Sequence, residues 1–178
     1  MAGIVAETIR VVLTNFTLTF LAFGLLVAAV AIARAASPRD GATVVEKLLA
    51  WHVFFSIGLG NFYNFVMHAF FGEMTARFIG WADSPFQFEV AMASLGFAAV
   101  GFLAAFRGFE MRLAAILGPS IFTLGAAAGH VYQMIAAHNF APGNAGLIFW
   151  TDILIPAFGF LLLWLQYRYG PRQKSAVV

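Results

Sequence analysis

The sequence predicts an all-α transmembrane helical bundle with five spans, formed by a single integral membrane domain over residues 1–178. First, 62% of the residues are hydrophobic and only 10% are charged, whereas about a quarter of an ordinary soluble domain is charged. Second, long uncharged apolar stretches recur along the chain. Third, the cations gather on segments that would share one side of a membrane. A chain this apolar needs lipid to cover part of its surface.

The charge-free stretches define the expected spans. Residues 113–151 contain no Asp, Glu, Lys or Arg, but this run is too long for one span of about 20 residues. The segment Asn139–Asn144 contains Pro142 and Gly143, which interrupt helices, so we divide the run there. The spans are expected at about residues 11–33, 48–71, 85–106, 112–137 and 145–167.

Five spans place the two termini on opposite sides of the membrane. Eight of the ten Lys and Arg residues would then share one side, and Arg10 and Arg77 would share the other. Because loops rich in Lys and Arg stay in the cytoplasm, this bias predicts an outer N-terminus and a cytoplasmic C-terminus. The residues on the predicted inner side are Arg34, Arg39, Lys47, Arg107, Arg112, Arg168, Arg172 and Lys174.

Charge and cysteine content exclude several classes of function. The net charge of +2 is small and dispersed, so we expect no nucleic-acid partner. The chain has no cysteine, which excludes disulfides, thiolate catalysis, iron–sulfur clusters and cysteine-ligated zinc. The expected partner is the lipid bilayer, with other membrane subunits or further copies of the chain left open.

Polar residues gather at one depth, in the outer half of the expected helices. Asn61, Asn64 and His68 share one face of the second helix. His130 and Gln133 share a face of the fourth helix. Because polar groups are costly in hydrocarbon, these faces should turn toward each other or toward a water-filled cavity. The expected binding residues are His68, Glu73, Glu89, His130 and Asp152, and the expected supporting residues are Asn15, Asn61, Asn64, Gln133 and His138.

These residues also have structural interpretations. Ser84–Gln87 is typical of a helix N-terminus, where Glu89 would stabilise the helix dipole without any further role. The two asparagines of the second helix could hydrogen-bond between helices. His138 lies in a predicted linker and could be an ordinary solvated residue. His68 and His130 lie at similar depth near two carboxylates, which favours a shared site.

Imidazole and carboxylate side chains are common ligands of transition metals. The five expected binding residues could therefore hold iron, zinc or copper. Two histidines alone could ligate one haem b, and His, Gln and Asn side chains could donate to the carbonyl groups of a quinone. We therefore expect a redox-associated protein that binds a metal or a quinone, with enzymatic activity left open. The alternatives are a structural or accessory subunit of a larger membrane complex and a small transporter.

Two neighbouring segments resemble a known group of proteins. Phe71–Trp81 (FGEMTARFIGW) and Ser84–Val90 (SPFQFEV) are similar to a family of uncharacterised bacterial inner-membrane proteins, which is itself similar to the DoxX-like four-helix proteins. The resemblance covers the second to fifth expected helices, so the first expected helix looks like an addition to a four-helix core. It implies a location in a bacterial inner membrane. Membership in the broader DoxX-like group would imply association with membrane oxidoreductases and quinone-linked electron transfer.

Overall fold

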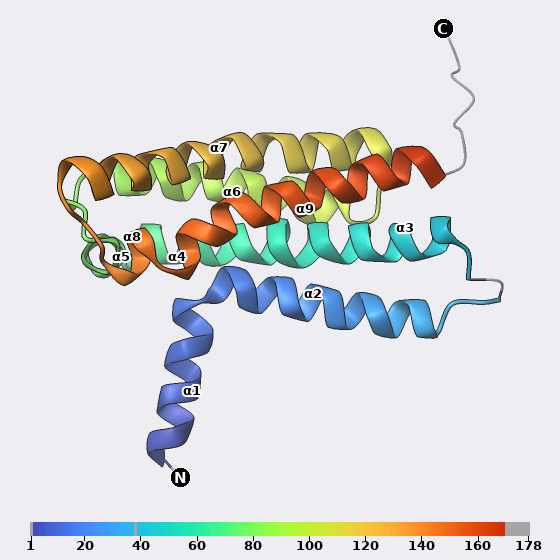
Figure 1. Cartoon of the computed structure of the whole chain (residues 1–178), viewed down its shortest axis with the longest axis horizontal. Coiled ribbons are helices and arrows are strands. Elements are labelled where there is room, and N and C mark those ends of the chain that lie inside the picture. Colours follow the sequence, from blue (N-terminus) through green and yellow to red (C-terminus); the bar gives the residue numbers. More distant parts are fainter. Residues whose placement is uncertain (1, 38, 170–178) are drawn as a thin grey trace, which may run out of the picture.

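The computed structural model describes residues 2–37 and 39–169, and these residues form helices and loops with no β-strand. The predicted all-α fold class is confirmed. Most helices run along one long axis, and α1 is set crosswise to them (Figure 1). Arg172 and Lys174 lie outside the described residues. The elements are α1 (Ala2–Thr14), α2 (Phe16–Ala33), α3 (Gly41–His52), η1 (Val53–Leu59), α4 (Gly60–Phe70), α5 (Gly72–Ile79), α6 (Phe86–Ala104), α7 (Phe109–Ala136), α8 (Pro142–Ala145) and α9 (Leu147–Tyr169).

The first expected span is split into two helices. Asn15 leaves the helical conformation (φ −113°, ψ 38°), and its Nδ2 donates to the Val11 carbonyl at 2.9 Å. Short polar side chains such as those of Thr14 and Asn15 compete with the backbone for helix hydrogen bonds, which favours a break here. The expected start of the span at residue 11 is therefore wrong. The membrane-length helix begins at Phe16, and α1 is a separate element.

The second expected span is longer than predicted and contains a π-helical segment. α3, η1 and α4 form one continuous helix over Gly41–Phe70, which begins well before residue 48. The Thr43 N–H donates to the Asp40 carboxylate at 2.8 Å, and this bond caps the helix and lowers the pKa of Asp40. Within η1, a Cβ on Gly101 of α6 would lie 2.7 Å from the Gly58 nitrogen. α6 and η1 therefore touch backbone to backbone, which only glycine permits.

Two short helices cap one end of the bundle, here called the α8 end, and neither was predicted. α5 and α8 lie together there, opposite the end where α3 begins, here called the α3 end (Figure 1). α5 ends at Gly80, whose φ of 77° lies in the left-handed region that glycine adopts without strain. Trp81 is the next residue after Gly80, so the end of α5 places it at the α8 end of the bundle.

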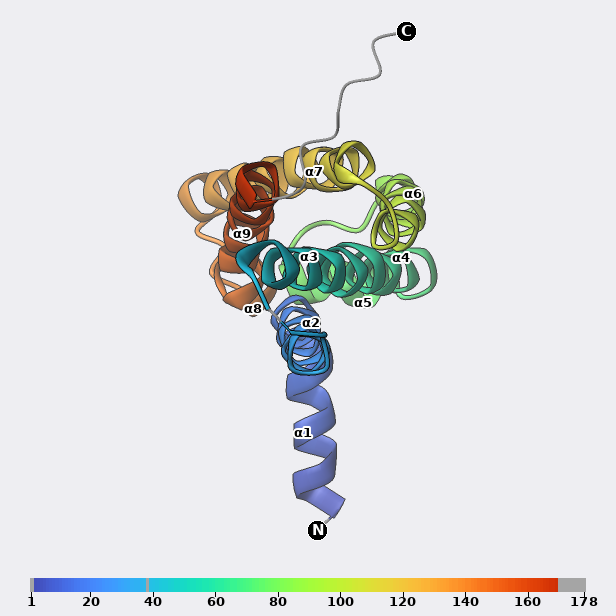
Figure 2. The ribbon, with the colours of Figure 1, turned by 90° about the vertical axis from the view of Figure 1, so that its right-hand side faces the viewer.

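The bundle packs solidly toward the α3 end. α7 packs along α9, and α4 packs along α6 (Figure 2). Pro119 and Pro156 are buried inside α7 and α9, where each removes one backbone hydrogen bond and loosens its helix. The buried apolar core consists of Leu49, Val53, Ala104, Ala115, Ile116, Leu162 and Leu163.

An ion pair between the buried Arg112 and the half-exposed Glu46 connects helices at the α3 end. The Arg112 side chain, only 2% exposed, donates to the two oxygens of Glu46 at 2.6 and 2.7 Å. It also donates to the carbonyls of Ala104 and Ala105 at 3.3 and 3.1 Å. Gln166 Nε2 donates to Glu46 at 3.0 Å. The guanidinium thus connects α7 to α3 and to the end of α6, and Glu46 extends the connection to α9.

Within residues 2–37 and 39–169, five helical segments are long and apolar enough to cross a membrane. Their outward faces carry large exposed apolar side chains, including those of Leu26, Leu103, Ile121, Ile135 and Trp164. Exposed apolar surface of this extent is typical of contact with lipid or with other protein. The segments are Phe16–Ala33, Gly41–Phe70, Phe86–Ala104, Phe109–Ala136 and Pro142–Tyr169.

Candidate functional site

A cavity of about 820 Å³ lies between the helices, in the half of the bundle nearer the α8 end. Ligand sites for small molecules commonly enclose about 300–1,000 Å³ and combine apolar walls with a few converging polar groups. The walls here are mainly apolar side chains from α1, α2, η1 and the helices from α4 to α9. The polar residues that line the cavity include Ser56, Asn61, Asn64, His68, Ser120, Thr123, His130, Thr151 and Asp152.

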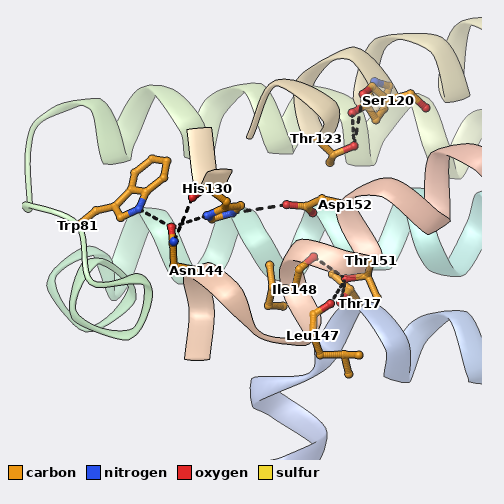
Figure 3. Close-up of polar contacts among 11 residues, drawn as sticks. Thr17, Trp81, Ser120, Thr123, His130, Asn144, Leu147, Ile148, Thr151 and Asp152 are labelled. Carbon is orange, nitrogen blue, oxygen red and sulfur yellow. Dashed lines mark hydrogen bonds and ion pairs between the residues drawn. The ribbon is translucent and has the colours of Figure 1, made fainter. Parts of the chain in front are cut away.

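Asn144 fixes the position of His130 at one end of this cavity (Figure 3). The Asn144 Nδ2 group donates to the carbonyls of His130 and Asn139 at 3.2 and 2.8 Å. Its Oδ1 atom is therefore the acceptor that faces Trp81 Nε1 and His130 Nδ1, both at 2.8 Å. His130 Nδ1 must then carry a proton, because Oδ1 can only accept. The Trp81 ring also packs against His130, with 5.3 Å between ring centroids.

His130 Nε2 faces Asp152 across helices α7 and α9. The distance from Nε2 to the nearer carboxylate oxygen is 3.6 Å, and both side chains are almost completely buried. A neighbouring contact holds α9 in place, because Thr151 Oγ1 lies 2.7 Å from Thr17 Oγ1 of α2. With Nδ1 committed to Asn144, Nε2 and the carboxylate of Asp152 are the groups that can exchange protons or hydrogen bonds with a ligand.

His68 lines the same cavity from α4. Its Nδ1 atom forms a short hydrogen bond with Gln87 Oε1, and Gln87 Nε2 donates to the Gly72 carbonyl at 3.3 Å. Gln87 therefore holds His68 as Asn144 holds His130, with Nδ1 protonated and Nε2 left for other partners. The two histidines thus line one cavity, each oriented by its own amide.

The expected acidic residues are divided by the fold. His130 and Asp152 are brought together, whereas Glu73 lies on the surface and pairs with Arg77 at 2.8 Å. Glu89 is exposed in the first turn of α6 and does not line the cavity. Among the described residues, no three His, Asp or Glu side chains lie close enough to hold a metal ion. The expected five-residue ligand set is therefore not assembled.

The expected supporting residues have mostly local roles. Asn64 Nδ2 donates to Ser94 Oγ at 2.9 Å and so connects α4 to α6. Asn61 is buried and bonds the Ile57 carbonyl of its own helix. The remaining three do not line the cavity: Asn15 bonds its own helix, Gln133 is half-buried, and His138 is exposed in the loop after α7.

The deeper part of the cavity contains polar groups that the protein itself does not satisfy. Ser56 and Ser120 line the cavity, and their hydroxyl oxygens are buried with no hydrogen-bond partner within the described residues. His52 lies one turn before Ser56, and both of its ring nitrogens are likewise without a partner there. A buried serine in a helix can bond the carbonyl four residues back, as Ser94 does with Val90 at 2.8 Å. Ser56 and Ser120 make no such bond, so each carries the cost of a buried polar group without a partner among the described residues.

Replacement of Ser120 by alanine is expected to leave the ligand-free protein equally stable or slightly more stable. The reason is that Ser120→Ala removes a buried hydroxyl that has no partner. The matched control Ser94→Ala removes a hydroxyl that accepts from Asn64 and donates to Val90. It should lower the free energy of unfolding by about 0.6 to 2 kcal/mol. Thermal unfolding in detergent compares the two, and equal destabilisation by both would show that Ser120 has a protein partner.

Sequence reasoning missed the residues that orient the two histidines. In the sequence, Asn144 belongs to the expected helix-breaking segment Asn139–Asn144 and Gln87 to the expected helix N-terminus Ser84–Gln87, and neither these two nor Trp81 is expected to orient a histidine. A weak signal was present, because Asn144 lies in a segment rich in Asn, Pro and Gly that adjoins two span-length helices. Asparagine is common in turns, and its amide can also orient a buried ring. The residue type alone therefore could not separate these two roles.

Comparison with known proteins identifies a family but no individual relative. No curated protein and no solved structure matches the chain. The family of unknown function DUF6790 matches residues 14–172, a region that begins at the last residue of α1 and contains every cavity-lining helix after it. The expectation that the chain belongs to an uncharacterised family is confirmed, and the chain is a member of the family of unknown function DUF6790.

Proposed function

We propose that this chain is a multi-pass membrane protein that binds a membrane-soluble ligand of the quinone class in the cavity. One observation carries the proposal: an oriented imidazole and a carboxylate, His130 and Asp152, converge on a largely apolar cavity of about 820 Å³ between membrane-length helices. A quinone has an apolar body with carbonyl oxygens, and it therefore needs both kinds of surface.

The His130–Asp152 pair suits both forms of such a ligand. When His130 carries a second proton, Nε2–H can donate to a quinone carbonyl, and the nearby Asp152 carboxylate offsets the charge. When Nε2 is unprotonated, it can accept from the hydroxyl of a quinol. Because Asn144 holds Nδ1 in both cases, the ring keeps one orientation. The site can thus bind the ligand in either state with the same geometry.

A quinone fits the described residues better than a metal ion does. Transition-metal sites in proteins commonly use three or four side-chain ligands. Among the described residues, no such group of His, Asp and Glu is assembled. The resemblance to the DoxX-like group supports the same choice, because it implies association with membrane oxidoreductases and quinone-linked electron transfer.

The charge distribution supports an inner-membrane location with the site facing the periplasm. Arg10 and Arg77 belong to the half of the bundle near the α8 end. The cations toward the opposite, α3 end should then face the cytoplasm, by the tendency of Lys and Arg to remain there. Within the described residues these are Arg34, Arg39, Lys47, Arg107, Arg112 and Arg168.

Purified protein in lipid nanodiscs is expected to bind a benzoquinone with a decyl tail saturably and at one site. Replacing His130 by alanine removes the hydrogen bond to the carbonyl, so affinity should fall by about tenfold to a hundredfold, which corresponds to a loss of about 1.5 to 3 kcal/mol. Equilibrium dialysis measures the affinity. Metal analysis and an absorption spectrum of the same sample test for iron, zinc, copper and haem b.

His138→Asn is the matched control, because His138 is exposed and outside the cavity, and asparagine tolerates its positive φ of 50°. This variant should bind the quinone as the wild type does. The proposal fails if the wild type shows no saturable binding, or if His130→Ala binds equally well. A stoichiometric metal or a haem absorption band would instead assign the site to that group.

A further inference from the structure

We propose that α1 lies flat in the interface of the bilayer, on the side of the α8 end, with its apolar face against the acyl chains. This goes beyond ligand binding, because it concerns how the chain contacts lipid. α1 leaves the bundle crosswise to α2 and projects away from the other helices in both views (Figures 1 and 2). Side-chain hydrogen bonds join its last turn to the following helices, where Leu13 O accepts from Tyr63 and Val12 O accepts from Thr19.

The position of α1 follows from the length of α2. α2 has 18 residues, which span about 27 Å at 1.5 Å per residue. The hydrocarbon core of a bilayer is about 30 Å thick. A helix of this length can cross the core only if both of its ends lie near the two surfaces. The junction at Asn15 is therefore at one surface, and a helix that leaves the junction crosswise runs along that surface.

The charged side chains of α1 lie on one side of the helix. At 100° per residue, Glu7, Arg10 and Thr14 fall on this side, and Val5, Ile9 and Val12 fall on the opposite side. The exposed apolar side chains of Ile4 and Val11 lie beside Glu7, at the border between the two sides. The apolar side chains are exposed, with Ile9 53% and Val5 57% accessible. This distribution is typical of helices that lie in a membrane interface.

The polar groups of α1 are arranged for a position near lipid head groups. Arg10 pairs with Glu7 at 2.5 Å, and this bond lowers the pKa of Glu7, so both groups stay charged at the surface. The hydroxyls of Thr8 and Thr14 bond carbonyls of their own helix, at Ile4 and Arg10. These bonds reduce the polar surface that α1 presents to lipid.

The last turn of α1 also forms part of the cavity wall. Arg10, Leu13 and Thr14 line the cavity together with Phe16 and Thr17 of α2. If α1 lies in the interface, this part of the cavity wall is level with the boundary between head groups and acyl chains. The exposed apolar side chains of α1 follow directly on those of α2. If lipid covers α2, the bilayer interface can cover α1 as well, and no second copy of the chain is needed.

Spin labelling tests this placement directly, because the chain has no cysteine and one introduced cysteine gives one label. The full-length variants Val5→Cys, Ile9→Cys and Glu7→Cys are labelled with a nitroxide in nanodiscs of phosphatidylcholine and phosphatidylglycerol. Labels at positions 5 and 9 should be more accessible to oxygen than to a water-soluble nickel chelate, at a depth of about 5–10 Å. The label at position 7 should show the reverse preference. Leu26→Cys, an exposed position within α2, provides the hydrocarbon reference.

Three results would overturn the inference. Equal access of the nickel chelate to all three labels would place α1 in water, away from the membrane. Oxygen-rich surroundings at all three would place α1 within the hydrocarbon. Spin–spin broadening that disappears on dilution with unlabelled protein would show that a second copy covers the apolar face. None of these results depends on whether the cavity binds a quinone, so this inference and the proposed function fail separately.

Discussion

Replacing Arg112 by alanine is expected to lower the free energy of unfolding by about 2 to 4 kcal/mol, because it removes a buried cation whose hydrogen bonds hold two backbone carbonyls and the half-exposed carboxylate of Glu46. Glu46 would lose both bonds from the guanidinium, and the carbonyls of Ala104 and Ala105 would lose donors. The end of α6, the start of α7 and the middle of α3 would then lose the side chain that connects them. Thermal unfolding in a defined detergent measures the loss.

The Glu73–Arg77 pair provides a matched control. It joins the same two residue types at 2.8 Å, but its side chains are 73% and 70% exposed. Exposed pairs contribute about 0 to 1 kcal/mol, so Arg77→Ala should have little effect on unfolding. Arg112→Lys should fall between the two, since lysine keeps the charge and loses the paired geometry. Equal effects of Arg112→Ala and Arg77→Ala would contradict the structural role assigned to Arg112.

Replacing Asn144 by alanine is expected to lower both stability and quinone affinity. Asn144 is fully buried and makes four hydrogen bonds, to Trp81, Asn139 and two atoms of His130. Because each buried polar group left without a partner costs about 1 to 3 kcal/mol, we expect a total loss of about 2 to 4 kcal/mol after local relaxation. His130 would lose the contact that sets its orientation, so affinity should approach that of His130→Ala.

Two further variants separate orientation from general stability. Trp81→Phe removes one of the four bonds and leaves both contacts to His130, so it should reduce stability less and preserve most of the quinone affinity. Asn15→Ala removes an asparagine that bonds only its own helix and the neighbouring Thr14. It should leave affinity unchanged. If Asn144→Ala binds the quinone as tightly as the wild type, Asn144 does not act through His130.

Local sequence properties were enough to define the membrane-length helices. An uncharged apolar run is visible without knowledge of its neighbours, and its length decides whether it can span. The expected ends at residues 33, 71, 106 and 137 therefore lie within two residues of the ends at Ala33, Phe70, Ala104 and Ala136. His130 and Asp152 were identified for the same reason, since a polar residue inside an apolar helix stands out.

Only the tertiary structure decided which of the polar residues meet. Trp81 and Asn144 are 63 residues apart in sequence, and Glu46 and Arg112 are 66 apart. Helical periodicity assigns a residue to a face but leaves open which helix that face contacts. Glu73 and Glu89 are consequently among the expected binding residues together with Asp152, although the fold places both glutamates on the surface.

By itself, the sequence determined an all-α chain with five membrane-length helices and a polar layer that includes His68, His130 and Asp152. The tertiary structure decided that α1 is a separate crosswise helix, that Arg112 is buried against Glu46, and that Asn144 and Gln87 orient the histidines. The physical reason is the separation along the chain of the residues that set each property. Apolarity and helix length depend on neighbouring residues, whereas burial and orientation depend on contacts between segments that are distant along the chain.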